Sequence, residues 1–288
     1  MDRRFEAQRE RTGDGMHQET EYIALTNDLL FHMVFTKNAE ALKSLLSTLL
    51  SIPEGSIQRV EILNPMQYSD MIASRLTVLD LKVHLNDERY VIVEMQVRRF
   101  EYWTNRTLAY ACRQVADQVQ GEFDYEKLEQ VVQISIMDHT LFGDHRRFFA
   151  KYELRDGEGY RYSDRLCFLV MDLTAADEAT EEERSKGLVE WADAFKAKSW
   201  NEVQRIENRG VKEAAKTMQM IMANPTERDL IRARLDAEID HRTIINAERR
   251  QGEKNAYIES ARRMKADGMP PELISKYTGL SIKELLSL

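Results

Sequence analysis

The sequence predicts a mixed α/β domain followed by a mainly helical C-terminal region. Up to about residue 175, segments with apolar residues at helical spacing are interspersed with segments that alternate as strands do. Beyond that point, residues 180–262 are rich in Ala, Glu, Lys, Arg and Met and contain Pro225 as their only proline. We therefore expect a domain over residues 20–175, a helical region over 176–262 and a small helical tail over 263–288.

The first expected element is helical and runs over residues 27–51. Thr26 or Asn27 is suited to cap it, and apolar residues then recur every three or four positions from Leu30 to residue 50. Residues 36–38, Thr-Lys-Asn, predict an interruption that divides the segment into two helices. Residues 51–55 contain Pro53 and Gly55, which end the unit.

The next elements are predicted to be strands around one more helix. Residues 57–64 are expected to form a strand, and residues 75–97 a β-hairpin with arms 76–84 and 90–97 around a polar turn at 86–88. Residues 100–120 have an amphipathic helical pattern that Gly121 is expected to stop. Residues 128–137 and 165–173 are predicted to be two further strands.

The hairpin carries two acidic residues whose placement depends on its register. With a three-residue turn at 86–88, Leu85 pairs with Arg89 and Asp80 falls opposite Glu94. Carboxylates at that spacing repel each other unless a cation lies between them, and Mg²⁺ prefers carboxylate oxygens. A shift of one residue would separate the pair. The alternative is that both acids are solvated on an exposed face, although an acid is costly in a strand as apolar as the one around Glu94.

Composition and charge exclude several classes of protein. The formal net charge is −8, which argues against a protein that coats nucleic acid nonspecifically. No apolar run approaches the roughly 18 residues of a membrane span, and the polar start predicts no secretory signal. Cys112 and Cys167 are the only cysteines, which argues against a disulfide framework or zinc site and predicts a cytoplasmic protein without a membrane partner.

Several segments, in this order, resemble one known family. Asp80, a spacer of about a dozen residues and then Glu94-Met95-Gln96 resemble the PD-(D/E)XK motif in its E-x-Q form. In the recombination-promoting nuclease or transposase-like family, similar segments surround this motif; here they are residues 25–35, 100–125 and 131–136. Residues 268–288 resemble the C-terminal segment that is common in this family. The resemblance to the nuclease core covers residues 22–145.

This resemblance implies a restriction-endonuclease-like fold, with a mixed sheet flanked by helices, and Mg²⁺-dependent endonucleolytic cleavage of double-stranded DNA. It implies that Asp80 and Glu94 hold the metal, with the main-chain carbonyl of Met95 and, through water, Asp28 as further ligands. Mn²⁺ or Ca²⁺ are alternative ions. Gln96 stands where the motif usually has lysine and is expected to orient the attacking water or the phosphate, although it carries no positive charge.

Other residues near the motif are candidates for binding DNA. Lys82 shares a strand face with Asp80, and Arg75 lies close to the motif in sequence. Arg106 and Tyr110 are spaced four apart on one helical face. His32 stands where the family often has lysine, and we expect it to be a surface residue of the helix. A homodimer is expected, because two sites related by a two-fold axis can cut both strands.

The tail and the negative charge leave rival functions open. Residues 270–288 resemble half of a helix-turn-helix, in which Gly279 suits the turn and Ser281 caps the second helix, but the segment lacks a basic recognition surface. A small helical cap or dimer contact is the alternative. Three functions remain open for the whole chain. The protein is an active nuclease linked to recombination, mobile elements or phage defence; or it is a catalytically weak DNA-binding relative; or it is a regulatory interaction protein.

Overall fold

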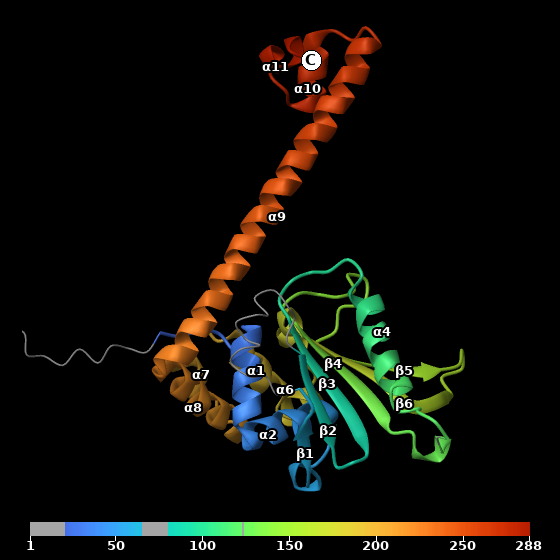
Figure 1. Ribbon diagram of the computed structural model, residues 1–288, viewed down its shortest axis with the longest axis vertical. Helices are drawn as coiled ribbons and strands as arrows, with labels where there is room; N and C mark the ends of the chain where they lie inside the picture. Colours follow the sequence, from blue (N-terminus) through green and yellow to red (C-terminus); the bar gives the residue numbers. More distant parts are fainter. Residues whose placement is uncertain (1–20, 65–79, 123) are drawn as a thin grey trace, which may run out of the picture. The chain divides into compact units, whose positions relative to one another are not determined.

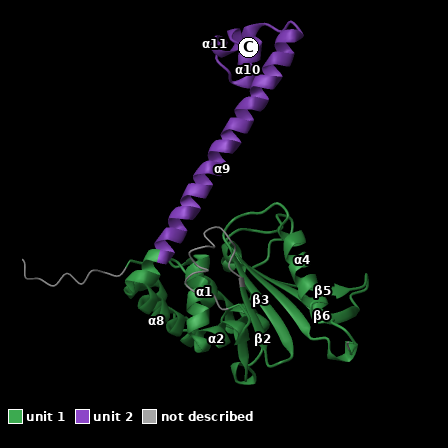
Figure 2. Cartoon of the chain, viewed as in Figure 1, with its two compact units in different colours: residues 1–71, 78–229 green, residues 72–77, 230–288 purple. Residues whose placement is uncertain are grey.

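The computed structural model describes residues 21–64, 80–122 and 124–288, which divide into two compact units within helix α9 (Figure 2). The first unit extends to Asp229 and contains a sheet and its surrounding helices. The second consists of residues 230–288. The predicted domain boundaries near residues 175 and 262 stay predictions.

The described part of the first unit is built on one six-stranded mixed sheet (Figure 1). The strand order is β1-β2-β3-β4-β6-β5, in which β3, β4 and β6 are parallel neighbours and the other pairs are antiparallel. This arrangement confirms the predicted mixed α/β fold. The strands are β1 (Val60–Ile62), β2 (Asp80–Leu85), β3 (Arg89–Gln96), β4 (Gln130–Met137), β5 (Phe149–Arg155) and β6 (Arg161–Asp172).

The hairpin of β2 and β3 has the register that the turn length predicts. Leu85 pairs with Arg89 and Asp80 with Glu94, around a turn in which Asn86 and Asp87 adopt positive φ. The predicted first arm also included residues 76–79, which lie outside the described residues. Strand β5 was not predicted, and β6 begins four residues earlier than expected, at Arg161. The predicted strand 57–64 is confined to β1.

Helices cover both faces of the sheet. The predicted interruption near residue 38 is confirmed, because Asn38 ends α1 and caps α2 with its side chain, as Asn27 caps α1. Helix α1 lies against β2 and β3 on the sheet face opposite α4, and α8 packs against α1 and α2 (Figure 1). The helices of this unit are α1 (Asp28–Lys37), α2 (Ala39–Leu50), α4 (Trp103–Ala116), α5 (Glu181–Ser185), α6 (Leu188–Lys196), α7 (Trp200–Gln204) and α8 (Arg209–Ala223).

Short 3₁₀ helices join these elements: η1 (Glu54–Ser56), η2 (Tyr125–Lys127) and η3 (Leu173–Glu178). Helix α4 ends at Ala116, so Gly121, which has a φ of 62°, follows the helix at a distance rather than stopping it. Helix α4 connects β3 to its parallel neighbour β4 and packs on the sheet through Ala111, against Ile92 and Val131. The sheet is therefore covered by α4 on one face and by α1 with its partners on the other.

The second unit is helical, as predicted. It contains most of α9 (Pro225–Ala266), then α10 (Pro271–Thr278) and α11 (Ile282–Leu286). Ala261, Ile274, Leu280 and Leu285 form its core. The predicted turn and cap are confirmed, because Gly279 adopts positive φ and Ser281 forms a capping box with Glu284.

Candidate metal and nuclease site

The candidate site lies where β2 begins and β3 ends. Asp80 and Glu94 are Cα partners in the antiparallel pair, so the predicted register brings these two sequence positions together. Glu94 is only 1% exposed and lies between the apolar Val93 and Met95 in the sequence, so it is not the solvated surface acid of the alternative interpretation. A carboxylate buried to this degree needs positive charge or hydrogen-bond donors nearby.

Arg106 supplies positive charge to Glu94 from helix α4. Its Nη2 atom lies 3.4 Å from Oε1 of Glu94, and 27% of its side chain remains exposed. The guanidinium also lies 5.3–5.6 Å from the ring centroids of Phe100, Trp103 and Tyr110. Because Tyr110 is one helical turn beyond Arg106, the predicted shared face of these two residues is confirmed. The aromatic rings hold the guanidinium beside the buried acid.

Gln96 follows Glu94 on the same face of β3 and is 3% exposed. Its side-chain amide donates a hydrogen bond to the main-chain carbonyl of Arg98, two residues later. Its own main-chain carbonyl accepts from the N–H of Asp138, which follows β4. These two bonds fix the end of β3 beside the end of β4. The amide that is expected to orient water or phosphate therefore has one of its two N–H groups engaged within the chain.

The face that carries Glu94 and Gln96 holds further buried polar residues that the sequence interpretation missed. In the parallel pairs, Ser135 is the partner of Glu94 and Gln133 is the partner of Ile92. Asp172 of β6 pairs with the same β4 residue as Gln96 does. All of these polar side chains are at most 3% exposed. Within the described residues, both amide atoms of Gln133 and Oδ2 of Asp172 are buried without a hydrogen-bond partner. A signal for Gln133 and Ser135 was present, because they alternate with Val132, Ile134 and Ile136.

A polar network continues from Asp172 into the loops after β3 and β4. Asp172 Oδ1 accepts hydrogen bonds from the N–H and hydroxyl of Thr174, and Arg99 donates to the carbonyl of Thr140. His139 lies close enough to Arg99, Asp172 and Asp138 for their charges to act on it. Burial and the charge of Arg99 lower its pKa, and Asp172 and Asp138 oppose that shift. His139 is thus biased toward the neutral imidazole, at the edge where the parallel strands end.

The remaining predicted residues lie at varied places. Asp28 is the first residue of α1, where its carboxylate accepts the N–H of Leu29, and α1 begins at the end of the sheet where β3 ends (Figure 1). Lys82 is partly buried and pairs with Ile92 in the hairpin. His32 is 1% exposed, so the expectation of a surface histidine is wrong. It belongs to a helix buried on nearly all sides. Arg75 lies outside the described residues.

A second group of possible metal ligands lies at the other end of the hairpin. Atoms of Glu61, His84 and Asp87 lie within 4.8 Å of one another. Arg59 already bridges the two carboxylates at 3.0 and 2.9 Å, and His84 lies 2.5 Å from Glu129. This cluster is therefore charge-compensated within the chain.

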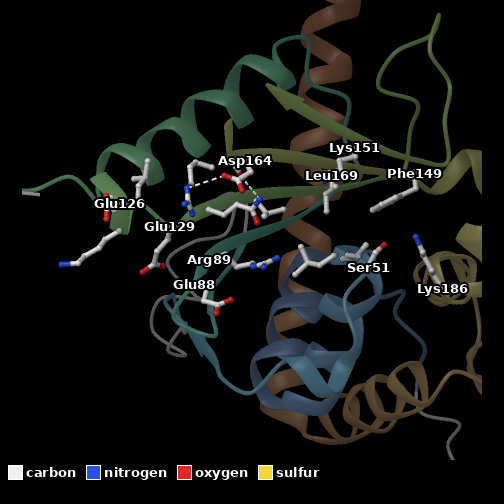
Figure 3. Close-up of a pocket in the computed structure, with 17 residues that line it drawn as sticks. Ser51, Glu88, Arg89, Glu126, Glu129, Phe149, Lys151, Asp164, Leu169 and Lys186 are labelled. Atoms are coloured by element: carbon white, nitrogen blue, oxygen red, sulfur yellow. Dashed lines mark hydrogen bonds and ion pairs between the residues drawn. The ribbon is translucent and has the colours of Figure 1, made fainter. Parts of the chain in front are cut away.

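A pocket of 780 Å³ lies near this end, between α2, β3 and the β5–β6 pair (Figure 3).

The donor set at Asp80 and Glu94 fits a hard divalent cation. Asp80 and Glu94 are Cα partners in register, Glu94 is buried, and Gln133 and Asp172 add polar atoms that lack partners within the described chain. Oxygen ligands of this kind suit Mg²⁺, Mn²⁺ or Ca²⁺ rather than a soft metal.

In the described part, none of the helices is long and apolar enough to cross a membrane.

Comparison with known proteins agrees with the fold of the first unit. The family model of the PD-(D/E)XK nuclease family transposase matches residues 25–248, which includes the whole sheet, α1 to α8 and more than half of α9. No curated protein and no solved structure matches the chain. The match covers most of the sequence, and we conclude that the chain belongs to the PD-(D/E)XK nuclease family of transposases.

Proposed function

We propose that this protein is a metal-dependent DNA endonuclease that hydrolyses phosphodiester bonds during recombination, in mobile elements or in phage defence. The observation that carries the proposal is the pairing of Asp80 with Glu94 in the hairpin, with Glu94 buried beside Arg106. Membership in a nuclease family supports the reaction class. A buried acid in register with a second acid is costly to a fold, which favours a functional reason for it.

In this proposal each residue has a distinct task. The carboxylates of Asp80 and Glu94 hold the cation, the carbonyl of Met95 is a further ligand, and Asp28 contributes through water. A bound Mg²⁺, Mn²⁺ or Ca²⁺ would lower the pKa of a water and neutralise charge on the phosphate. Arg106 holds the Glu94 carboxylate in place, in keeping with their 3.4 Å separation.

The phosphodiester is contacted by groups around the carboxylates. Lys82 lies on the Asp80 face of β2 and is suited to touch a phosphate oxygen, and Tyr110 and Arg75 are candidates for the DNA groove. Gln96 uses one amide N–H on Arg98, and its second N–H is the group that would orient water or phosphate. In-line attack of water on phosphorus would form one P–O bond as the P–O bond to the leaving oxygen breaks. The water proton would pass to solvent or to a nearby base, and the leaving oxygen would take up a proton from solvent.

A second function is favoured by the charge of the chain. The net charge of −8 and the long, charged α9 suit a regulatory interaction protein that keeps the nuclease fold, and a catalytically weak DNA-binding relative is the other alternative. A DNA-binding protein is retained on a DNA column, and its retention decreases as the salt concentration rises, whereas a regulator of another protein is not retained. The cytoplasmic location and the homodimer are part of the main proposal, and Cys112 and Cys167 are both free thiols, in keeping with a reducing compartment.

The test is the cleavage of supercoiled plasmid by the full-length protein with Mg²⁺, Mn²⁺ or Ca²⁺, and with EDTA. We expect nicking or linearisation that requires metal and is lost in Asp80→Asn and in Glu94→Gln. Asp87→Asn is the matched control, because it removes an acid from the same hairpin and belongs to the competing cluster with Glu61 and His84. Cleavage that survives Glu94→Gln but fails in Asp87→Asn would transfer the metal to that cluster. No cleavage by folded protein with any metal would favour the second function.

A further inference from the structure

The pocket at the far end of the sheet has a floor of unusual composition. Its volume is 780 Å³, within the roughly 300–1,000 Å³ of small-molecule sites. The floor is the part of the sheet face beyond the end of α2. By strand alternation, the pocket-lining side chains of β3, β4, β5 and β6 that share this face are Arg89, Gln130, Val132, Phe149, Lys151 and Leu169. The floor therefore combines apolar surface with two cations and no acid.

The charges that line the pocket are unevenly distributed, with Glu88 and Asp164 between its two ends (Figure 3). Glu126 and Glu129 lie at one end, near η2, whereas Lys151 and Lys186 lie at the other, together with Ser51 and Phe149. Arg89 lies between them with its side chain directed toward Ser51. Glu129 is already 2.5 Å from His84. One half of the pocket is thus basic and partly apolar.

Arg89 differs from the other cations of the pocket. Lys127, Lys151, Arg165 and Lys186 each pair with a carboxylate, at distances of 2.5–3.6 Å. Arg89 is partly buried, and within the described chain it has no ion pair. The Lys186–Glu182 pair is solvent-exposed and contributes little, so the Lys186 ammonium group is free to turn to a ligand. Lys151 is held by Glu153 at 2.8 Å, but 55% of its side chain is exposed, so its ammonium group can contact a ligand while it keeps that pair. A partly desolvated guanidinium beside two such lysines is suited to a phosphate group.

We propose that this pocket binds a nucleoside monophosphate or a phosphate monoester of similar size. The phosphate lies between Arg89, Lys151 and Lys186, and the planar ring lies on the apolar surface of Phe149 and Leu169. Inorganic phosphate alone would leave that surface uncovered, and an uncharged nucleoside would leave Arg89 without an anionic partner. The site is independent of the proposed nuclease reaction, because the paired carboxylates lie at the opposite ends of β2 and β3.

Calorimetric titration of the full-length protein tests this site, with AMP, adenosine and inorganic phosphate as probes. We expect saturable binding of AMP and at least tenfold weaker binding of the other two. Arg89→Ala should weaken AMP binding by about tenfold or more, because a hydrogen bond to a charged group is lost. Lys151→Ala should weaken AMP binding severalfold. The AMP affinity of Arg89→Lys should lie between those of wild type and Arg89→Ala. Lys216→Ala, an exposed lysine of α8 outside the pocket, should leave it unchanged.

Four outcomes would overturn the proposal. The first is no binding at millimolar AMP, and the second is an AMP affinity that is unchanged in both Arg89→Ala and Lys151→Ala. The third is loss of AMP binding in Glu94→Gln. The fourth is a 5′-phosphorylated oligonucleotide that binds the protein more than tenfold tighter than AMP does. The last would assign the surface to DNA. Lys151 is exposed, so its variant keeps the test open if Arg89→Ala fails to fold. AMP binding by a Glu94→Gln protein that cannot cleave plasmid would separate this site from the nuclease site.

Discussion

Replacing Arg106 with methionine should destabilise the first unit by about 2–3 kcal/mol in the absence of metal. Removal of one partner from a fully buried ion pair costs roughly 3–5 kcal/mol, because the other charge stays buried without compensation. Glu94 is 1% exposed, but 27% of the Arg106 side chain reaches solvent, which places the cost below that range. Methionine keeps much of the contact with Phe100, Trp103 and Tyr110, so the loss reports the charge. The melting temperature should fall by roughly 4–12 °C.

Thermal and urea unfolding in EDTA and in Mg²⁺ measure this effect, with Arg113→Met as the control on an exposed position of the same helix. If Asp80 and Glu94 hold the ion, it replaces the lost positive charge, so Mg²⁺ should stabilise the Arg106 variant more than wild type. A hundredfold excess over Kd contributes about 2.7 kcal/mol. Equal stability of the two variants in EDTA would refute the role of Arg106, and equal Mg²⁺ effects would refute a metal at Glu94.

Three further predictions concern the packing and charges of the first unit. Gly210→Ala should destabilise by about 1–3 kcal/mol, because the new Cβ would lie 2.3 Å from Ser44 Cβ, and Ser44→Gly in the same chain should restore urea stability. Asn38→Ala should cost about 2 kcal/mol in urea unfolding, through the lost α2 cap and the bonds to α8. Hydrogen bonds from Lys151 and Arg155 hold the pKa of Glu153 at about 2, so its stabilisation is present above its usual pKa of about 4.5 and lost as pH falls toward 2. Glu153→Gln should therefore be less stable than wild type at pH 6, and the two unfolding curves should converge near pH 2.

The local elements of the fold were predictable because their signals are contained in short segments. The turn at 86–88 and the alternation on its two arms were sufficient to give the pairing of Asp80 with Glu94. Asn27 and Asn38 are cap residues whose side chains accept main-chain N–H groups three residues on. Strand β5 was missed although its sequence alternates as a strand does, with Lys151, Glu153 and Arg155 between apolar residues, and it is only partly buried. Its pairing with β6 stabilises it, and that information lies in another segment.

The composition of the candidate site was predictable only in part, because the parallel pairs are non-local. Glu94 and Gln96 belong to a motif within one strand, but Ser135 and Asp172 join them through the order β3-β4-β6. That order depends on the crossover through α4 and on β5 being set outside β6. Spacing along the sequence does not contain this information. The buried amide of Gln133 and the carboxylate of Asp172 could be assigned to the same face only after the strand order was known.

The position of Arg106 bears on how a site with glutamine in the third motif position obtains positive charge. Gln96 is neutral, is 3% exposed and donates to the Arg98 carbonyl, so it secures the end of β3 and supplies no charge. A lysine introduced there would have to bury its ammonium group, at a cost that only a nearby acid offsets. Arg106 brings a cation to Glu94 from α4, outside the strand motif, and three aromatic rings hold it there. Charge at this site therefore depends on the docking of α4 on the sheet, and a search confined to the strand motif would not find it.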